Sequence, residues 1–100
     1  MRNYEIMFIV KPTISEEEIS NVAKSFKETL ESNGSKVVSV DAWGQKPLAY
    51  EIKISSDLYK SGYYYVYKVE ASDDTGIKEF TRLARINADI IRHLVINKED

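Results

Sequence analysis

Residues 4–34 read YEIMFIVKPTISEEEISNVAKSFKETLESNG, which is the pattern of a strand followed by a helix. The apolar side chains of the first seven residues occupy both faces of the strand: Ile6, Phe8 and Val10 lie on one face, and Met7 and Ile9 on the other. A strand that is apolar on both faces needs cover on both sides. We therefore expect residues 4–10 to form an inner strand of a sheet.

The helix that follows has recognisable start and stop signals. Pro12 ends the strand, and Ser15 followed by Glu18 forms a capping box that satisfies the first free amides of a helix. Apolar residues then recur at helical spacing, namely Ile19, Val22, Ala23, Phe26 and Leu30. Gly34 comes directly after this run and is a typical C-terminal stop.

The next part of the chain predicts a long β-hairpin. Its strand segments are residues 37–42, 48–54 and 63–71, which are rich in valine, isoleucine and tyrosine. Gly44 and Pro47 indicate a bulge or bend between the first two segments. The hairpin turn is predicted at residues 55–62.

A second helix and a last strand complete the pattern. Ser72, Asp73 and Asp74 are N-cap candidates, and the helix is marked by Ile77, Phe80, Leu83 and Ala84. Gly76 in its first turn weakens the helical signal. Residues 90–97 form the last strand.

The order strand, helix, strand, strand, helix, strand predicts an α+β fold. With right-handed crossovers it gives a ferredoxin-like split βαβ sandwich, a four-stranded antiparallel sheet with both helices on one face. Residues 1–100 are expected to be a single domain. Phe26 and Leu30 of the first helix are predicted to pack on Ile6 and Phe8.

Two helices leave the other face of such a sheet open. If the odd-numbered residues of the first strand point to that face, several apolar side chains share it: Met7, Ile9, Tyr64, Val66, His93 and Val95. A patch of this kind favours a surface for a protein or RNA partner; the alternative is a partly wet sheet face with scattered apolar residues, which is common.

Composition excludes several classes of protein. The chain has no cysteine, so disulfides and thiolate metal sites are excluded and an intracellular setting is expected. No run of eighteen apolar residues exists, so no membrane span is expected. The start MRNYEIMFIV resembles a weak signal peptide, but Glu5 interrupts it and we interpret it as mature structure.

Catalytic chemistry has little support in the sequence. His93 is the only histidine, so neither a Cys/His dyad nor a conventional zinc site can be built, and no metal or cofactor is expected. The four glycines are isolated, so no phosphate-binding glycine motif exists. An acylphosphatase of this fold would need an anion loop after the first strand, but residues 11–15 contain neither arginine nor glycine.

A net charge of −2 is unusual for a nucleic-acid-binding protein. However, acidic and basic residues are segregated along the chain, and the basic ones gather at Lys46, Lys53, Arg82, Arg85, Arg92 and Lys98. A local positive face is therefore possible on an acidic protein. Residues 62–66, Gly-Tyr-Tyr-Tyr-Val, approximate the base-stacking strand of an RNA-recognition motif, but Tyr64 and Lys68 depart from that motif and sheet packing explains the tyrosines better.

Residues 41–53, DAWGQKPLAYEIK, carry the most specific signal. They resemble the signature of the bacterial small-subunit ribosomal protein six family, in which a glycine and a basic residue precede Leu-Ala-Tyr and an isoleucine. The start MRNYEI and residues 85–95, RINADIIRHLV, are similar to the same family in order and spacing.

This resemblance implies the fold predicted above and a structural role in the cytoplasmic ribosome, without catalysis, cofactor or small-molecule substrate. It also implies binding to the central domain of small-subunit rRNA as a heterodimer with the basic small-subunit ribosomal protein eighteen. A basic partner would explain how an acidic chain reaches RNA. A regulatory domain that pairs sheets edge to edge and binds a small ligand is the main alternative.

The resemblance and the open face of the predicted sheet together indicate two sets of site residues, with Met7, Tyr64 and His93 taken from the open face. Those expected to face rRNA are Arg2, Tyr4, Lys46, Arg85, Arg92 and His93. Those expected at the partner-protein surface are Met7, Trp43, Leu48, Tyr50, Ile52 and Tyr64. The hairpin departs from the family pattern at Gln45, Pro47 and Glu51, and is therefore less basic than usual.

Overall fold

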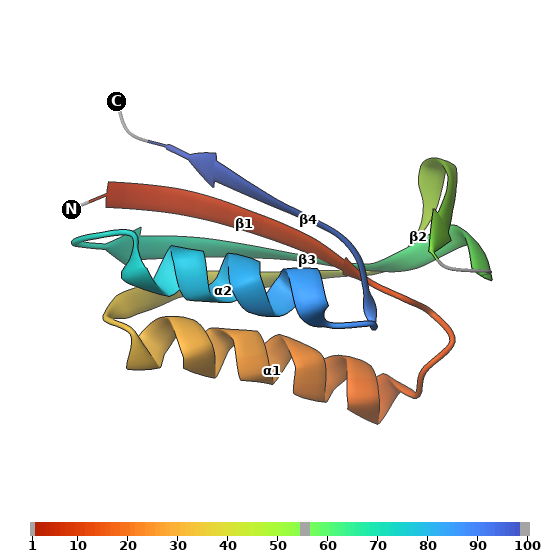
Figure 1. Ribbon diagram of the computed structural model, residues 1–100, viewed down its shortest axis with the longest axis horizontal. Coiled ribbons are helices and arrows are strands. Elements are labelled where there is room, and N and C mark those ends of the chain that lie inside the picture. Colours follow the sequence, from red (N-terminus) through yellow and green to blue (C-terminus); the bar gives the residue numbers. More distant parts are fainter. Residues whose placement is uncertain (1, 55–56, 99–100) are drawn as a thin grey trace.

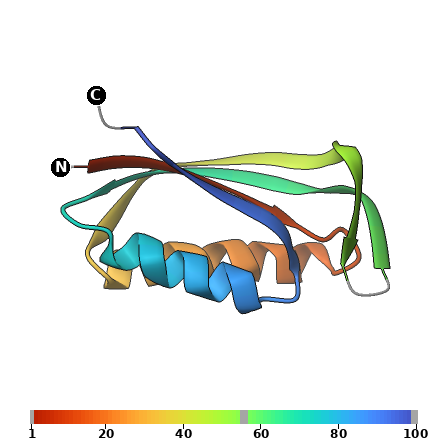
Figure 2. The same ribbon diagram turned by 45° about the horizontal axis from the view of Figure 1, so that its top comes forward.

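The computed structural model of the protein describes residues 2–54 and 57–98. Its elements are β1 (Arg2–Val10), α1 (Glu16–Ser32), β2 (Ser35–Ile54), β3 (Asp57–Ala71), α2 (Thr75–Ile86) and β4 (Ile90–Asn97). The strands form one antiparallel sheet in the order β2-β3-β1-β4, and both helices lie on the same side of it (Figures 1 and 2). The predicted ferredoxin-like split βαβ sandwich is confirmed.

The core lies between the helices and the side of β1 that carries Ile6, Phe8 and Val10. The Phe8 ring meets the Phe26 ring of α1 edge to face, with ring centroids 5.1 Å apart, and Phe26 meets Phe80 of α2 in the same way at 5.0 Å. Such aromatic pairs add to the free energy of burial itself. The prediction that Phe26 and Leu30 pack against this side of β1 is confirmed, since all of these residues share one buried cluster.

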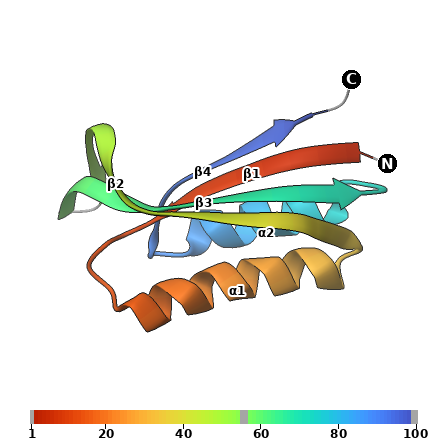
Figure 3. The same cartoon turned by 180° about the vertical axis from the view of Figure 1, so that it is seen from behind.

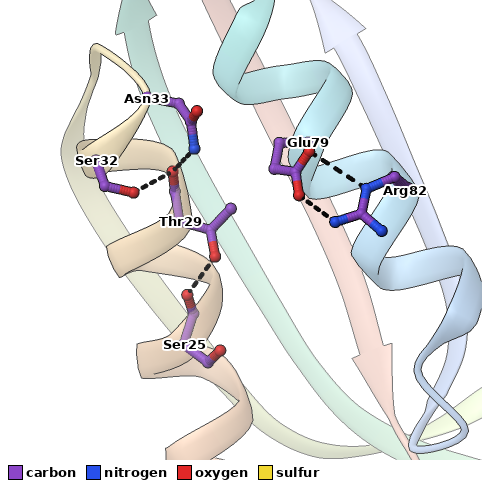
Figure 4. A network of polar contacts seen from close by, with 6 residues as sticks. All are labelled: Ser25, Thr29, Ser32, Asn33, Glu79 and Arg82. Atoms are coloured by element: carbon purple, nitrogen blue, oxygen red, sulfur yellow. Dashed lines mark hydrogen bonds and ion pairs between the residues drawn. The ribbon is translucent and has the colours of Figure 1, made fainter.

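Both ends of α1 use the residues that the sequence indicated. The Ser15 hydroxyl accepts a hydrogen bond from the Glu18 amide over 3.2 Å, as an N-cap should. At the other end, the Asn33 side-chain amide donates to the Thr29 carbonyl over 2.8 Å (Figure 4). Gly34 then takes a positive φ of 87°, a conformation that ends helices and that glycine adopts without strain.

Tyr67 of β3 ties the sheet to α1. Its ring is almost fully buried, and its hydroxyl donates a hydrogen bond to the Ala23 carbonyl over 2.5 Å. Burial, and to a smaller extent the neighbouring Tyr65, raises the pKa of the Tyr67 hydroxyl well above its ordinary value. The folded state therefore holds this proton more tightly than the unfolded state does.

This difference predicts how stability depends on pH. The stabilisation from Tyr67 should be complete below the pKa of an unfolded tyrosine, about 10, and should be lost as the pH rises above it. Urea unfolding of the wild type and of Tyr67→Phe between pH 8 and pH 11 measures the effect. The variant should be about 1–2 kcal/mol less stable at pH 8, and the gap should narrow as the pH rises. A gap that stays constant up to pH 11 would contradict the assignment.

The β2–β3 hairpin is longer and more irregular than predicted. β2 runs unbroken from Ser35 to Ile54, with register shifts beside Gly44 and Pro47, where a bulge or bend was expected. The turn predicted at residues 55–62 is wrong in its extent, because residues 57–62 already belong to β3 and pair with β2; residues 55 and 56 lie outside the described residues. The sequence does not indicate this extension of β3, because small and polar residues such as Ser61 and Gly62 are typical of turns.

The far end of this hairpin has a small core of its own. It extends past the ends of the helices and bends out of the main sheet (Figures 1 and 3). Ile52 and Tyr59 from the hairpin pack there against Ile9 of β1 and Ile91 of β4. Gly62 permits this contact, since a Cβ at that position would lie 2.3 Å from a methyl carbon of Ile9.

Gly76 has a packing reason for its place in the first turn of α2. A Cβ at this position would lie 2.5 Å from the hydroxyl oxygen of Ser35, the first residue of β2. The glycine therefore lets the start of α2 approach β2 closely. Of the three N-cap candidates, Asp74 is the N-cap, although its side chain makes no capping hydrogen bond. The Asp73 carboxylate instead accepts a hydrogen bond from the Thr75 amide over 3.0 Å.

Strand pairing fixes which residues lie on the open face, the side of the sheet away from the helices. Residues paired directly across neighbouring strands share a face, so Met7 shares the open face with Val66 and Leu94, and Ile9 shares it with Tyr64. The assignments of Met7, Ile9, Tyr64 and Val66 are confirmed.

The same prediction is wrong for two residues of β4. His93 pairs with Phe8 and Val95 pairs with Ile6, so both lie on the helix side of the sheet. The His93 ring contacts Phe80 there, with ring centroids 6.2 Å apart. A register shift at Ile9 and Val10 lets two consecutive residues of β4, Ile90 and Ile91, both be buried, and this fixes the alternation that follows.

Candidate nucleic-acid interface

A hollow of about 530 Å³ lies between α2 and the neighbouring ends of β1 and β4. We call it the α2 hollow; the lining residues that matter here are Arg2, Tyr4, Ile77, Arg82, Arg85 and Ile86. Three residues expected to face rRNA thus line one hollow, because the fold brings Arg85 of α2 beside Arg2 and Tyr4 of β1. Tyr4 is only 6% exposed, so it forms part of the wall and takes part in the core at the same time.

The α2 hollow is more basic than the residue predictions implied. Lys78 and Arg82 also line it, and with Arg85 they follow the helical spacing of four and three residues that places side chains on one side of α2. That spacing is visible in the sequence and could have identified both residues. Asp74 is the one carboxylate among the residues that line this hollow.

Ion pairs hold some of these cations in place. The Arg82 guanidinium donates hydrogen bonds to Glu79, which lowers the pKa of that carboxyl (Figure 4). The Lys78 Nζ lies 3.4 Å from the Asp74 Oδ2, within ion-pair distance. Within residues 2–54 and 57–98, no carboxylate lies within salt-bridge distance of Arg85. Arg85 is therefore the α2 cation best placed to meet an outside anion.

Arg92 and His93 lie in β4 and line hollows other than the α2 hollow. A second hollow, at the end of α2 and the start of β4, is lined by Arg85, His93 and Lys11 among others, and Arg92 and His93 line a third with Lys53. Arg92 is exposed on the open face. Basic side chains therefore follow α2 from Arg2 to the start of β4, where Arg92 adds a positive charge on the opposite, open face of the sheet.

His93 adds little positive charge to this group of basic side chains. Burial lowers the pKa of its imidazole, and the charge of Arg85 lowers it further. The ring is therefore neutral near pH 7 and acts as a hydrogen-bonding group rather than a cation. Lys46 lies elsewhere, exposed on β2 opposite Gly62 in the hairpin.

The residues expected at the partner-protein surface are only partly exposed. Trp43 is 49% exposed and lies parallel to Tyr64, with ring centroids 6.1 Å apart and an angle of 9° between the rings. Met7 lies on the open face beside the exposed Leu94. Ile52 is 9% exposed and belongs to the hairpin core, against which Leu48 packs; the side chain of Tyr50 lies outside the described residues.

Two negative findings concern the described residues only. Across residues 2–54 and 57–98, no cluster of three or more histidine, cysteine, aspartate or glutamate residues could hold a metal ion. Within the same part of the chain, no helix has the length and apolar character needed to cross a membrane.

Comparisons with known proteins agree with this structure. The family model described as ribosomal protein S6 matches residues 3–97. The crystal structure of 30S ribosomal protein S6 from Thermotoga maritima superposes on the chain with a TM-score of 0.88 at 30% sequence identity, covering 97% of this chain and 87% of that one. This family is a structural component of the small ribosomal subunit rather than an enzyme, so the acylphosphatase alternative is set aside. The chain belongs to the ribosomal protein S6 family.

Proposed function

We propose that the chain binds the central domain of small-subunit rRNA as a heterodimer with small-subunit ribosomal protein eighteen. The observation that carries the RNA part is the convergence of Arg2, Tyr4 and Arg85 on one basic hollow. Arginine contacts phosphate through two parallel hydrogen bonds, which fixes orientation as well as adding affinity. Arg92 and His93 extend this surface towards β4, and Lys46 is a separate contact from the hairpin.

The distribution of charge supports one orientation on RNA. α1 carries five glutamates and only two lysines, whereas α2 carries one glutamate and three basic residues. An RNA backbone is repelled by the first helix and attracted by the second. The chain therefore meets RNA along α2 and β4, with α1 turned away.

The side chains on the open face of the sheet support the proposed contact with the partner protein. Trp43, Met7, Tyr64 and Leu94 form an apolar surface beside the hairpin, which aromatic side chains make suitable for a protein contact. Protein eighteen, being basic, supplies positive charge that this acidic chain lacks. Of the other proposed partner residues, Leu48 and Ile52 support the hairpin from within.

Binding to a central-domain rRNA fragment tests the whole proposal. Affinity should be measured for the chain alone, for protein eighteen alone and for the pair, across a salt series from about 50 mM to 200 mM. The pair should bind more tightly than either protein, and its affinity should fall steeply with salt. Absence of pair formation, or of salt-dependent RNA binding by the pair, would overturn the proposal.

Trp43→Ala should weaken formation of the pair without unfolding the chain. The side chain is half-exposed, so its loss leaves the core intact, but a central aromatic residue in an interface contributes about 2 kcal/mol, or about 30-fold in affinity. Titration calorimetry with protein eighteen measures this change. Leu58→Ala is the matched control, because Leu58 is 54% exposed and pairs with Lys53 in the hairpin, whereas Tyr64 pairs with Gly44. Equal effects of both variants would contradict the assignment of the partner surface.

A further inference from the structure

We infer that the α2 hollow receives the base of one unpaired RNA nucleotide, in addition to the phosphates that its arginines contact. This inference rests on the proposed rRNA binding and names the part of the RNA that this site takes. It begins from the apolar character of the hollow, which binding to phosphate alone does not explain.

Apolar side chains line the hollow together with the basic ones. Ile77 and Tyr4 are each 6% exposed and belong to the core, while Ile86, at the end of α2, is 68% exposed. Among the large apolar side chains whose burial the structure describes, Ile86 is the most exposed. Leaving this much apolar surface in water is unfavourable, and a phosphate group gains nothing from contact with it.

A nucleobase has the chemistry that this arrangement fits. Its flat apolar faces can pack on Ile86 and on the part of Tyr4 that lines the hollow, while Arg2 and Arg85 reach the phosphates on either side. The volume of about 530 Å³ lies within the range of roughly 300–1,000 Å³ found for small-molecule pockets.

The nucleotide must be unpaired. In a base-paired A-form helix the bases are stacked, and the major groove is too deep and narrow for a side chain to reach them. A base that fills a hollow on the protein has to leave that stack, as bases in bulges, loops and junctions do. The occupant is therefore a single-stranded or junction nucleotide within the bound RNA.

Coupling between an RNA change and a protein change tests the inference. Each unpaired nucleotide of the central-domain fragment is replaced in turn by one that lacks its base, and binding to the pair with protein eighteen is measured. At one position the loss of the base should weaken binding about tenfold. The same replacements are then measured with Ile86→Gln, which makes the lining less apolar without changing charge. Leu58→Gln is the control, because Leu58 is also more than half exposed, at 54%, and does not line the hollow.

The inference requires non-additive effects. At the sensitive position, loss of the base should reduce the RNA affinity of the Ile86→Gln complex with protein eighteen threefold or less, since the contact is already gone. The same loss should reduce the affinity of the Leu58→Gln complex about tenfold. If every baseless nucleotide affects Ile86→Gln and wild type equally while salt-dependent binding persists, the base does not enter this hollow and the inference is overturned. Loss of all RNA binding by the wild-type pair would instead overturn the proposed function.

Discussion

Replacing Phe26 with alanine is expected to destabilise the fold by about 3–5 kcal/mol. The ring is 2% exposed and meets Phe8 of β1 and Phe80 of α2 edge to face, so it joins both helices to the central strand. Its removal loses the burial of a large aromatic side chain and leaves a cavity that the helices cannot fill without moving. Urea unfolding followed by circular dichroism measures the change in free energy.

The matched control is Lys24→Ala on the exposed side of the same helix. It should change the free energy of unfolding by no more than about 0.5 kcal/mol, because surface substitutions of this kind touch no core contact. A loss well under 1 kcal/mol for Phe26→Ala would mean that α1 packs on the sheet through another face.

Removing Arg2 and Arg85 together should weaken binding of the pair to the rRNA fragment about 100-fold. Both guanidinium groups line the α2 hollow, and each charge-assisted contact to phosphate is worth more than a neutral hydrogen bond. The slope of log affinity against log salt should become shallower by about two, since two phosphate contacts are lost. Filter binding or fluorescence anisotropy at several salt concentrations gives both values.

Lys24→Ala combined with Lys27→Ala is the control for charge alone. It changes the net charge by the same amount, but on acidic α1, away from the basic side chains of α2. This control should leave both the affinity and the salt slope nearly unchanged. If the two double variants weaken binding equally, net charge rather than the α2 hollow governs binding, and the assignment of Arg2 and Arg85 is wrong.

The sequence predicted those parts of the fold whose signals are local. The alternation of residues 4–10 and the Ser15–Glu18 cap each depend on neighbours within a few residues, and both appear in the structure as expected. The order of elements then restricts the topology to a few choices. The family resemblance implied that Arg2 and Arg85 each face rRNA, but their presence in the lining of one hollow is seen only in the fold.

The features that escaped prediction depend on pairing between distant segments. The side of the sheet on which His93 lies is set by a register shift against β1, which no pattern within residues 90–97 reveals. The early start of β3 depends on its pairing with the bent end of β2. Lys78 and Arg82 were visible as a helical row, but only the approach of β1 and β4 turns that row into one wall of a hollow.

The separate core at the end of the hairpin has a consequence for cooperativity. Ile9, Ile52, Tyr59 and Ile91 form a buried cluster distinct from the main one. The hairpin end can therefore open without disrupting the packing of Phe8 and Phe26, at a lower free energy than global unfolding. Backbone amides of residues 58–60 should then exchange with deuterated solvent faster than those of residues 65–69, making this end of the molecule the region that can adjust its shape as the ribosomal subunit assembles.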